Sequence, residues 1–177
     1  MAICKLSKDI LKADSCGYAL KQIVTLYIAN FDDVTEAALG TKGNTVATIT
    51  MKGDAKWYAV QPNKNSASFE DTLGIADGGG HYRIPSVTFS YGGNYDGDAV
   101  DTLDAISLGR FMVAAQLSDG QTILFGRLAP MEASVATLSA AAEATGAQGV
   151  TATLTADSNE APLPLEEAAI KVIKGIV

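Results

Sequence analysis

Residues able to do chemistry are few in this sequence, and their spacing matches no catalytic group. His81 is the only histidine, and it follows the glycine run at 78–80, which is typical of a loop. Ser86 and Ser90 have no nucleophile-elbow motif around them and no second histidine to act as their base. The glycine run lacks the lysine and the serine or threonine of a phosphate-binding loop. These residues predict a protein that is not an enzyme.

A run of acidic residues near the middle of the sequence could bind calcium. Asn94, Asp96, Asp98, Asp101 and Asp104 lie close together, and side-chain oxygens of Asn and Asp are ligands that calcium prefers. The run lacks the glycine expected at the sixth position of a calcium loop, and Ala105 occupies the position of the last carboxylate. Asp98 and Asp101 are also typical of the first turn of a helix, where the helix dipole favours negative charge. We therefore expect no metal ion and no other cofactor.

The composition indicates one folded, acidic domain. The chain has 177 residues, of which 47% are hydrophobic, so it can bury a core of ordinary size. Its 13 Lys and Arg against 20 Asp and Glu give a net charge of −7, which disfavours sequence-specific DNA binding. Cys4 and Cys16 predict two reduced thiols, because no histidine completes a zinc motif with them. The apolar runs are short, so we expect neither a signal peptide nor a membrane span.

Most of the elements that must position these residues are expected to be β-strands. Alternating or β-branched residues predict strands at 21–30, 45–51, 57–60, 67–73, 82–91 and 149–155. The segments 45–51 and 57–60 are expected to pair as a hairpin, because the residues between them favour a turn. Pro85 marks the strand at 82–91 as an edge strand or a bulged one.

Helices are expected in fewer places. Asp98 can cap a helix whose apolar residues recur at helical spacing up to Ile106, and Gly109 stands where a left-handed residue ends a helix. The tail from Leu165 predicts either a second helix, with a glutamate four residues before a lysine, or an arm. Residues 133–149 are rich in Ala, Ser and Gly, which indicates a long loop or a weak strand.

Two of the expected strands have one polar face. In the segment 67–73, Ser68, Glu70 and Thr72 alternate with apolar residues. In the segment 149–155, threonines alternate in the same way with Val, Ala and Leu. This alternation is typical of strands that bury one face and expose the other to water.

The segment 114–127, AAQLSDGQTILFGR, predicts a β-hairpin with an Asp-Gly turn at 119–120. A two-residue turn places Ala115 opposite Leu124 and makes both faces of the hairpin apolar. One face then carries Phe111, Val113, Ala115, Leu117, Leu124 and Leu128, and the other carries Met112, Ala114, Ile123 and Phe125. A small domain normally exposes one side of an antiparallel sheet, so the second face needs a covering helix or a neighbouring subunit.

Aromatic residues leave a second class of function open. Exposed aromatic rings can form a platform for sugars or peptides, and the candidates are Trp57, Tyr58, Tyr82, Tyr91 and Tyr95. The same residues are also suited to packing in a core. A glycan-binding β-domain is therefore an alternative to a structural protein.

The order of several segments resembles one known family. The segments are CGYALKQIVTLYIANFDDV at 16–34, SASFEDTLG at 66–74, YRIPSVTFSY at 82–91, GRFMVAAQLSDGQTILFGR at 109–127 and GVTATLTADSNEAPLPL at 149–165. Together they resemble the tail tube proteins of bacteriophages, especially those of gut phages, and the tube-fold ring proteins of crAss-like phage tails. The resemblance covers residues 16–165 and rests on strand and turn patterns. Family members end soon after the NEAPLPL-like segment, whereas this chain continues with the apolar residues Ile170, Val172, Ile173 and Ile176.

The resemblance implies a mainly β fold: an antiparallel β-barrel or sandwich of the phage tail tube type, with one short flanking α-helix, long loops and terminal arms. Residues 1–165, with an N-terminal arm, would form a single domain, and 166–177 would be an extension, either a helix or an arm. The implied function is structural. Copies of the chain would form stacked, hexameric rings that line the conduit for genome delivery, with the loop at 133–149 and the termini joining successive rings.

The implied partners are other copies of the chain and other tail proteins, namely a neck or terminator protein, a tip or baseplate and, in a contractile tail, a sheath. DNA would pass through without specific binding, and the protein would be part of the virion tail after synthesis in the cytoplasm of the bacterial host. The candidates for subunit interfaces are Met112, Ala114, Ile123, Phe125, Ile170 and Ile173, and those for the lumen are Ser68, Glu70 and Thr72. Alternatives are a ring, neck or tail-terminator protein of a short-tailed phage and a glycan-binding β-sandwich module.

Overall fold

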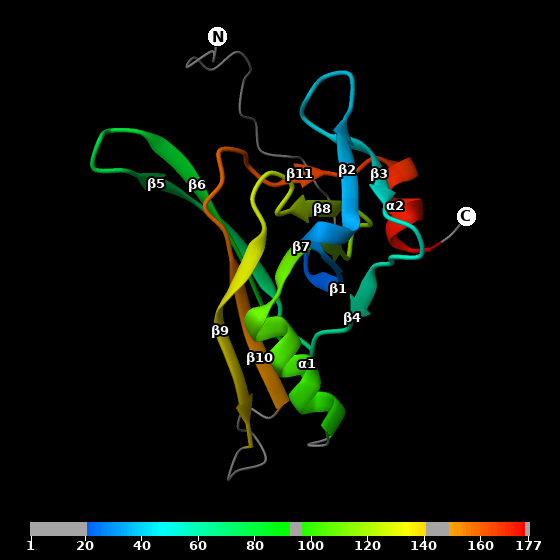
Figure 1. Ribbon diagram of the computed structural model, residues 1–177, viewed down its shortest axis with the longest axis vertical. Coiled ribbons are helices and arrows are strands. Elements are labelled where there is room, and N and C mark those ends of the chain that lie inside the picture. The colour runs from blue at the N-terminus through cyan, green and yellow to red at the C-terminus, as the bar shows by residue number, and fades with distance from the viewer. Residues whose placement is uncertain (1–20, 93–96, 141–148, 176–177) are drawn as a thin grey trace, which may run out of the picture.

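The computed structural model describes residues 21–92, 97–140 and 149–175, and these form a mainly β protein with antiparallel sheets (Figure 1). The early strands are β1 (Ile23–Asn30), β2 (Val34–Leu39), β3 (Val46–Met51), β4 (Tyr58–Val60), β5 (Ser68–Ile75) and β6 (His81–Tyr91). The later strands are β7 (Arg110–Leu117), β8 (Thr122–Phe125), β9 (Met131–Ser139), β10 (Gly149–Thr155) and β11 (Leu163–Pro164). The helices are α1 (Gly97–Leu108), α2 (Glu167–Ile173) and the short 3-10 turn η1 (Phe31–Asp33).

The strands form one large sheet and one small one. The large sheet has nine strands in the order β11-β8-β7-β9-β10-β6-β5, with β1 also paired to β7 and β4 paired to β1. The small sheet contains β2 and β3. The expected mainly β, antiparallel architecture is confirmed. The large sheet ends at β11 and β5, so the strands of the described ranges do not close into a barrel.

Buried apolar side chains form two cores on opposite sides of β7. The first core is lined by Leu26, Ile28, Val87, Phe89, Ile106, Phe111, Val113, Ala115, Phe125, Met131, Ala152, Leu154 and Ala156. The second core is lined by Ala29, Val46, Ile49, Trp57, Met112, Ala114, Leu124, Leu165, Ala169 and Ile173. Successive residues of β7 alternate between the cores, as a strand covered on both faces must.

The β7–β8 hairpin forms as expected, but its register differs by one residue from the expected one. Its loop has three residues, because Leu117 N donates to the carbonyl of Gln121 at 2.8 Å and Gly120 takes a left-handed φ of 87°. Ala115 therefore pairs with Ile123, not with Leu124. A shift by one residue moves every side chain of a strand to the other face. Ile123 and Phe125 consequently pack on the first core and Leu124 on the second.

The expected hairpin between residues 45–51 and 57–60 is wrong. β3 pairs with β2, and β4 pairs with β1 through Leu26 and Val60. The turn after β3 does form, since Ala55 N donates to the carbonyl of Lys52 at 2.9 Å. The chain then passes to a different sheet instead of folding back on β3, and β2, which the sequence patterns did not indicate, takes that place.

Helix α1 matches the expected helix, while the expected reason for Gly109 is wrong. The backbone of Gly109 does not have a positive φ. A Cβ at this position would overlap the ring of Phe111 and the carbonyl of Ala105, so glycine is needed for close approach. The segment expected to be a long loop or weak strand begins inside strand β9, and residues 141–148 lie outside the described part of the chain.

The C-terminal tail takes the helical alternative. In α2, Lys171 Nζ lies 3.0 Å from Glu167 Oε1, which is the expected pair four residues apart. Ala169 and Ile173 are buried in the second core, so the helix packs on its own chain. Ile176 lies outside the described residues.

Candidate functional site

The strands β9, β10, β6 and β5 present a row of hydroxyl side chains on one face. In the register, Thr151 of β10 lies between Thr137 of β9 and Ser90 of β6. Thr88 of β6 lies between Thr153 of β10 and Ser68 of β5, and Thr155 pairs with Ser86. We call these eight side chains the hydroxyl face; they come from strands that are far apart in the sequence. The opposite face of the same strands carries Val87, Phe89 and Leu154 into the first core. The alternation in each strand therefore produces a mainly polar surface, with the exposed Val135 of β9 beside Thr153.

Hydrogen bonds between neighbouring strands hold part of the hydroxyl face in place. The hydroxyl oxygens of Thr88 and Thr153 are 3.0 Å apart, and those of Ser90 and Thr151 are 2.7 Å apart. Cross-strand hydroxyl pairs of this kind stabilise a sheet locally. Each of these two pairs uses one hydroxyl hydrogen between neighbouring strands.

The charges on this face are negative. Glu70 on β5 pairs in register with Ser86, and Glu132 on β9 pairs with Thr155, so the two carboxylates flank one row of hydroxyls. Among the described residues of β5, β6, β9 and β10 that point to this side, none is a lysine or an arginine. At the margin of the face, Arg110 of β7 pairs in register with Glu132, and its guanidinium forms an ion pair with Asp32. A polyanion therefore finds no basic side chain on these four strands.

The expected lumen residues lie on this surface. Ser68, Glu70 and Thr72 are exposed on β5, on the same side as the threonines of β10. The sequence patterns indicated both polar faces separately. Their juxtaposition through β6 depends on long-range pairing, which the patterns do not contain.

The expected interface residues lie inside the chain. Met112, Ala114 and Ile173 are buried in the second core, and Phe125 is 1% exposed in the first. Ile123 and Ile170 are half-buried and pack against the same cores. Of the two covers expected for the second face of the β7–β8 hairpin, the structure has the intramolecular one, supplied by helix α2 and the β2–β3 sheet. Met112, Ala114, Phe125 and Ile173 are therefore not exposed for an interface, whereas Ile123 and Ile170 keep part of their surface.

Exposed apolar side chains occur instead on the hairpin formed by β5 and β6. Leu73 is 57% exposed and Ile75 is 64% exposed, both on the side of β5 opposite Glu70. In the sequence, the alternation of apolar and polar residues in this strand predicted that its apolar side is buried. The strand extends beyond the rest of the sheet, and the sequence gives no signal for where the covering elements end.

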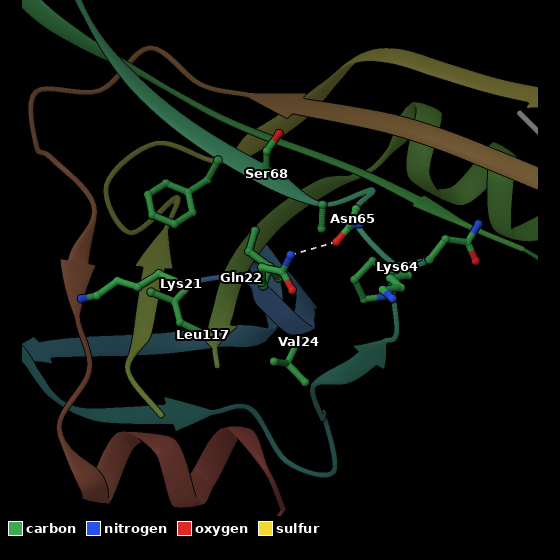
Figure 2. Close-up of a pocket in the computed structure, with 12 residues that line it drawn as sticks. Lys21, Gln22, Val24, Lys64, Asn65, Ser68 and Leu117 are labelled. Atoms are coloured by element: carbon green, nitrogen blue, oxygen red, sulfur yellow. Dashed lines mark hydrogen bonds between the residues drawn. The ribbon is translucent and has the colours of Figure 1, made fainter. Parts of the chain in front are cut away.

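A groove lies at the start of β1 (Figure 2). It has a volume of about 680 Å³ and is lined by Lys21, Gln22, Ile23, Val24, Pro62, Asn63, Lys64, Asn65, Ala67, Ser68, Phe69 and Leu117. Gln22 Nε2 donates to Asn65 Oδ1 at 2.8 Å, which closes one side. The lining holds two lysines and no carboxylate, so it contains no acid–base pair.

One of the lysines at this groove is engaged elsewhere. Lys21 Nζ lies 3.0 Å from Asp119 Oδ2 at the β7–β8 turn. The hydrogen bond from Lys21, with a second from the backbone N–H of Gln121, lowers the pKa of the Asp119 carboxyl. The pair fixes the turn to the start of β1, which is a structural role.

A partly buried ion pair fixes the segment that follows β8. Arg127 Nε donates to Glu160 Oε2 at 2.6 Å, and the guanidinium also reaches Glu160 Oε1. Both side chains are about one fifth exposed. The carboxylate raises the pKa of Arg127, because its hydrogen bonds favour the charged guanidinium.

The residues considered for catalysis do not come together. His81 is at the exposed end of β6, and Ser86 and Ser90 belong to the hydroxyl face. In the three described ranges, no group of three or more His, Cys, Asp or Glu side chains is placed to hold a metal ion. Cys4, Cys16 and Asp96 lie outside those ranges.

The candidate aromatic platform is dispersed. Trp57 is buried in the second core, and Tyr58 is exposed under Lys56. Tyr82 lies over Gly74, and Tyr91 stacks on Phe89 at a centroid distance of 6.3 Å. Tyr95 is not among the described residues. The four described rings therefore share no single surface.

Comparisons with protein-family models, with curated proteins and with solved structures find no match to this chain. Neither helix in the part of the chain that the structure describes is long and apolar enough to cross a membrane.

Proposed function

We propose that this chain is a structural subunit of a phage tail, which assembles with copies of itself into rings that line a conduit for DNA. The observation that carries the proposal is the hydroxyl face, whose four strands present flanking carboxylates and no basic side chain, while Arg110 at its margin is ion-paired with Asp32. A conduit wall must be wetted, so that it does not adhere to apolar surfaces, and must not bind the phosphates that move past it. Hydroxyls with negative charge meet both requirements.

The arrangement of the strands supports assembly by lateral addition. β5 is the last strand of the large sheet, and along its outer edge no described strand pairs with it. On the other side, β9 pairs with β7 only at Met131 and Glu132. Unpaired strand edges favour pairing with another chain. Neighbouring copies could extend the hydroxyl face into a continuous wall.

The resemblance to tail tube proteins adds the ring and the stacked tube to this picture. A tube subunit needs no catalytic group, and this agrees with a protein whose most distinctive feature is the polar side of a sheet. The same resemblance implies that the conduit belongs to the virion tail and that other tail proteins cap its ends. The proposal does not require the β7–β8 hairpin as an interface, since that hairpin is buried.

Electron microscopy of the purified protein tests whether it assembles. DNA binding by the assemblies tests whether the hydroxyl face lines the conduit without holding DNA. We expect rings or tubes that retain no DNA. Glu70→Lys combined with Glu132→Lys should make the same assemblies retain DNA at low salt, because each change places a cation on the wall.

The matched control is Glu36→Lys, which reverses an exposed charge on β2, away from the hydroxyl face. This control should leave DNA retention close to that of the original protein. A chain that stays monomeric at every concentration contradicts assembly. If Glu36→Lys increases DNA retention by the rings as much as Glu70→Lys does, this contradicts the proposal that the hydroxyl face lines the conduit.

A further inference from the structure

The β5–β6 hairpin projects from the body of the protein (Figure 1), and its side opposite Glu70 carries Leu73 and Ile75 beside their register partners Arg83 and His81. Leu73 and Ile75 point to this side and are exposed. The turn at the end is closed by hydrogen bonds between Ala76 and Gly80 and between Gly79 and Ala76, each 2.8 Å. We call residues 73–81 the hairpin tip. Apolar side chains grouped on a projecting element are typical of a contact surface.

The hairpin is held rigidly at its base. Arg83 Nε donates to Asp71 Oδ2 at 3.0 Å across the two strands. The backbone of Arg83 also exchanges hydrogen bonds of 2.7 and 2.9 Å with Ser158. An element that is already ordered loses less conformational freedom on binding, so the hairpin tip is suited to dock as a rigid unit.

A groove of about 490 Å³ on another part of the molecule has the complementary properties. It is lined by Tyr27, Met51, Ala55, Lys56, Trp57, Ala59, Val172, Ile173, Lys174 and Gly175, and we call it the Trp57 groove. Trp57 is only 8% exposed, yet its indole N–H has no hydrogen-bond partner. This N–H is itself closed to solvent, so a docking segment would reach only the small exposed part of the Trp57 side chain.

The charges of the two surfaces are opposite. Lys56 and Lys174 are the charged residues that line the Trp57 groove. On the hairpin tip Asp77 is the acidic residue and His81 stands beside Ile75, while Arg83, beside Leu73, forms an ion pair with Asp71. An acidic loop with apolar residues beside it therefore fits an apolar groove with lysines at its rim.

The two surfaces cannot meet within one molecule. The hairpin extends to the left in Figure 1, whereas β4 and α2, which flank the groove, lie to the right. Contact between different surfaces of identical copies is heterologous, and it repeats from one copy to the next. We propose that the hairpin tip of one copy docks into the Trp57 groove of a second copy. This docking rests on the proposed function, in which it would join one ring to the next.

The first test replaces both exposed apolar residues of the tip, Leu73→Asp with Ile75→Asp. Single rings should still form, because β5 keeps its backbone edge, but stacking should require at least about tenfold more protein. Leu108→Asp is the matched control, since Leu108 is an exposed leucine at the end of α1. The control should stack like the original chain. Particle lengths in electron micrographs give the measurement.

Fluorescence reports on the groove itself, because Trp57 is the only tryptophan in the sequence. As the original chain stacks, the emission of Trp57 should shift with protein concentration. The double variant of Leu73 and Ile75 should show no such shift over the same range. This readout separates docking in the Trp57 groove from stacking through any other surface.

Charge reversal supplies a second test. Asp77→Lys alone and Lys56→Glu with Lys174→Glu alone should each weaken stacking, and the combination of all three should restore it. Stacking without a fluorescence change, or a combination that fails to restore stacking although each change alone weakened it, overturns the docking and leaves the rings intact. An original chain that forms no rings overturns the proposed function and this docking together.

Discussion

The hairpins β7–β8 and β5–β6 both contain apolar strand residues, and their surroundings are opposite. In the β7–β8 hairpin both faces are apolar, and each packs on a core of the same chain. In the β5–β6 hairpin one face is polar, and the apolar side is left exposed toward the tip at Leu73 and Ile75. The difference shows that apolar content does not locate an interface. What decides is whether elements distant in the sequence return to cover the strand.

The largest effect on stability is expected from a charged substitution in the β7–β8 hairpin. Phe125→Asp should destabilise the folded chain by more than about 4 kcal/mol, because it places a carboxylate in the first core. Denaturant unfolding of the monomer measures the loss. A folded Phe125→Asp chain of unchanged stability that only fails to assemble would contradict the burial of this side chain and restore the hairpin as an interface.

A smaller effect is expected at the segment that leaves β8. Glu160→Gln should lower the free energy of unfolding by about 1–3 kcal/mol, since it leaves the guanidinium of Arg127 without a charged partner. Arg127→Met combined with Glu160→Gln should recover part of that loss, because no unpaired charge is left behind. Thermal unfolding of the three proteins makes the comparison. Equal stability of Glu160→Gln and the original chain would show that the pair is not structural.

A still smaller effect concerns acid at the β7–β8 turn. Because the pKa of Asp119 is lowered in the folded state, its contribution to stability is present above the pKa of an unfolded aspartate and is lost as the pH falls. Asp119→Asn should therefore be less stable than the original chain near neutral pH, with the difference shrinking between about pH 5 and pH 3. Melting temperatures across this range measure it. Lys21→Gln should remove most of the pH dependence, and a persistent one would contradict its cause.

The smallest effect on stability is expected at the β5–β6 hairpin. Leu73→Asp should change the free energy of unfolding by no more than about 0.5 kcal/mol, because the side chain is already exposed in the single chain. Its effect should appear in association instead. A large loss of stability in the monomer would mean that Leu73 is covered by its own chain, and the contrast between the hairpins would then disappear.

Local patterns predicted the strands better than their partners. Alternation of apolar and polar residues was sufficient for β5, β6 and β10, and the spacing from Val100 to Ile106 was sufficient for α1. The β7–β8 register was missed because Ser118 joins Asp119 and Gly120 in the loop, and an Asp-Gly pair is compatible with a turn of either length.

Long-range pairing accounts for the remaining differences. β4 pairs with β1 and not with β3, although β3 is nearer in sequence. The cover of Met112 and Ala114 comes from α2, more than fifty residues later in the chain. The polar faces of Ser68 and Thr153 were visible separately, and only the pairing through Thr88 joins them.

The native mass of the purified chain, measured over a wide range of concentrations, tests the central claim most directly. The proposed function predicts one closed species whose mass is a fixed multiple of 18.3 kDa, together with larger multiples of that species when rings stack. A single mass of 18.3 kDa at every concentration would contradict it.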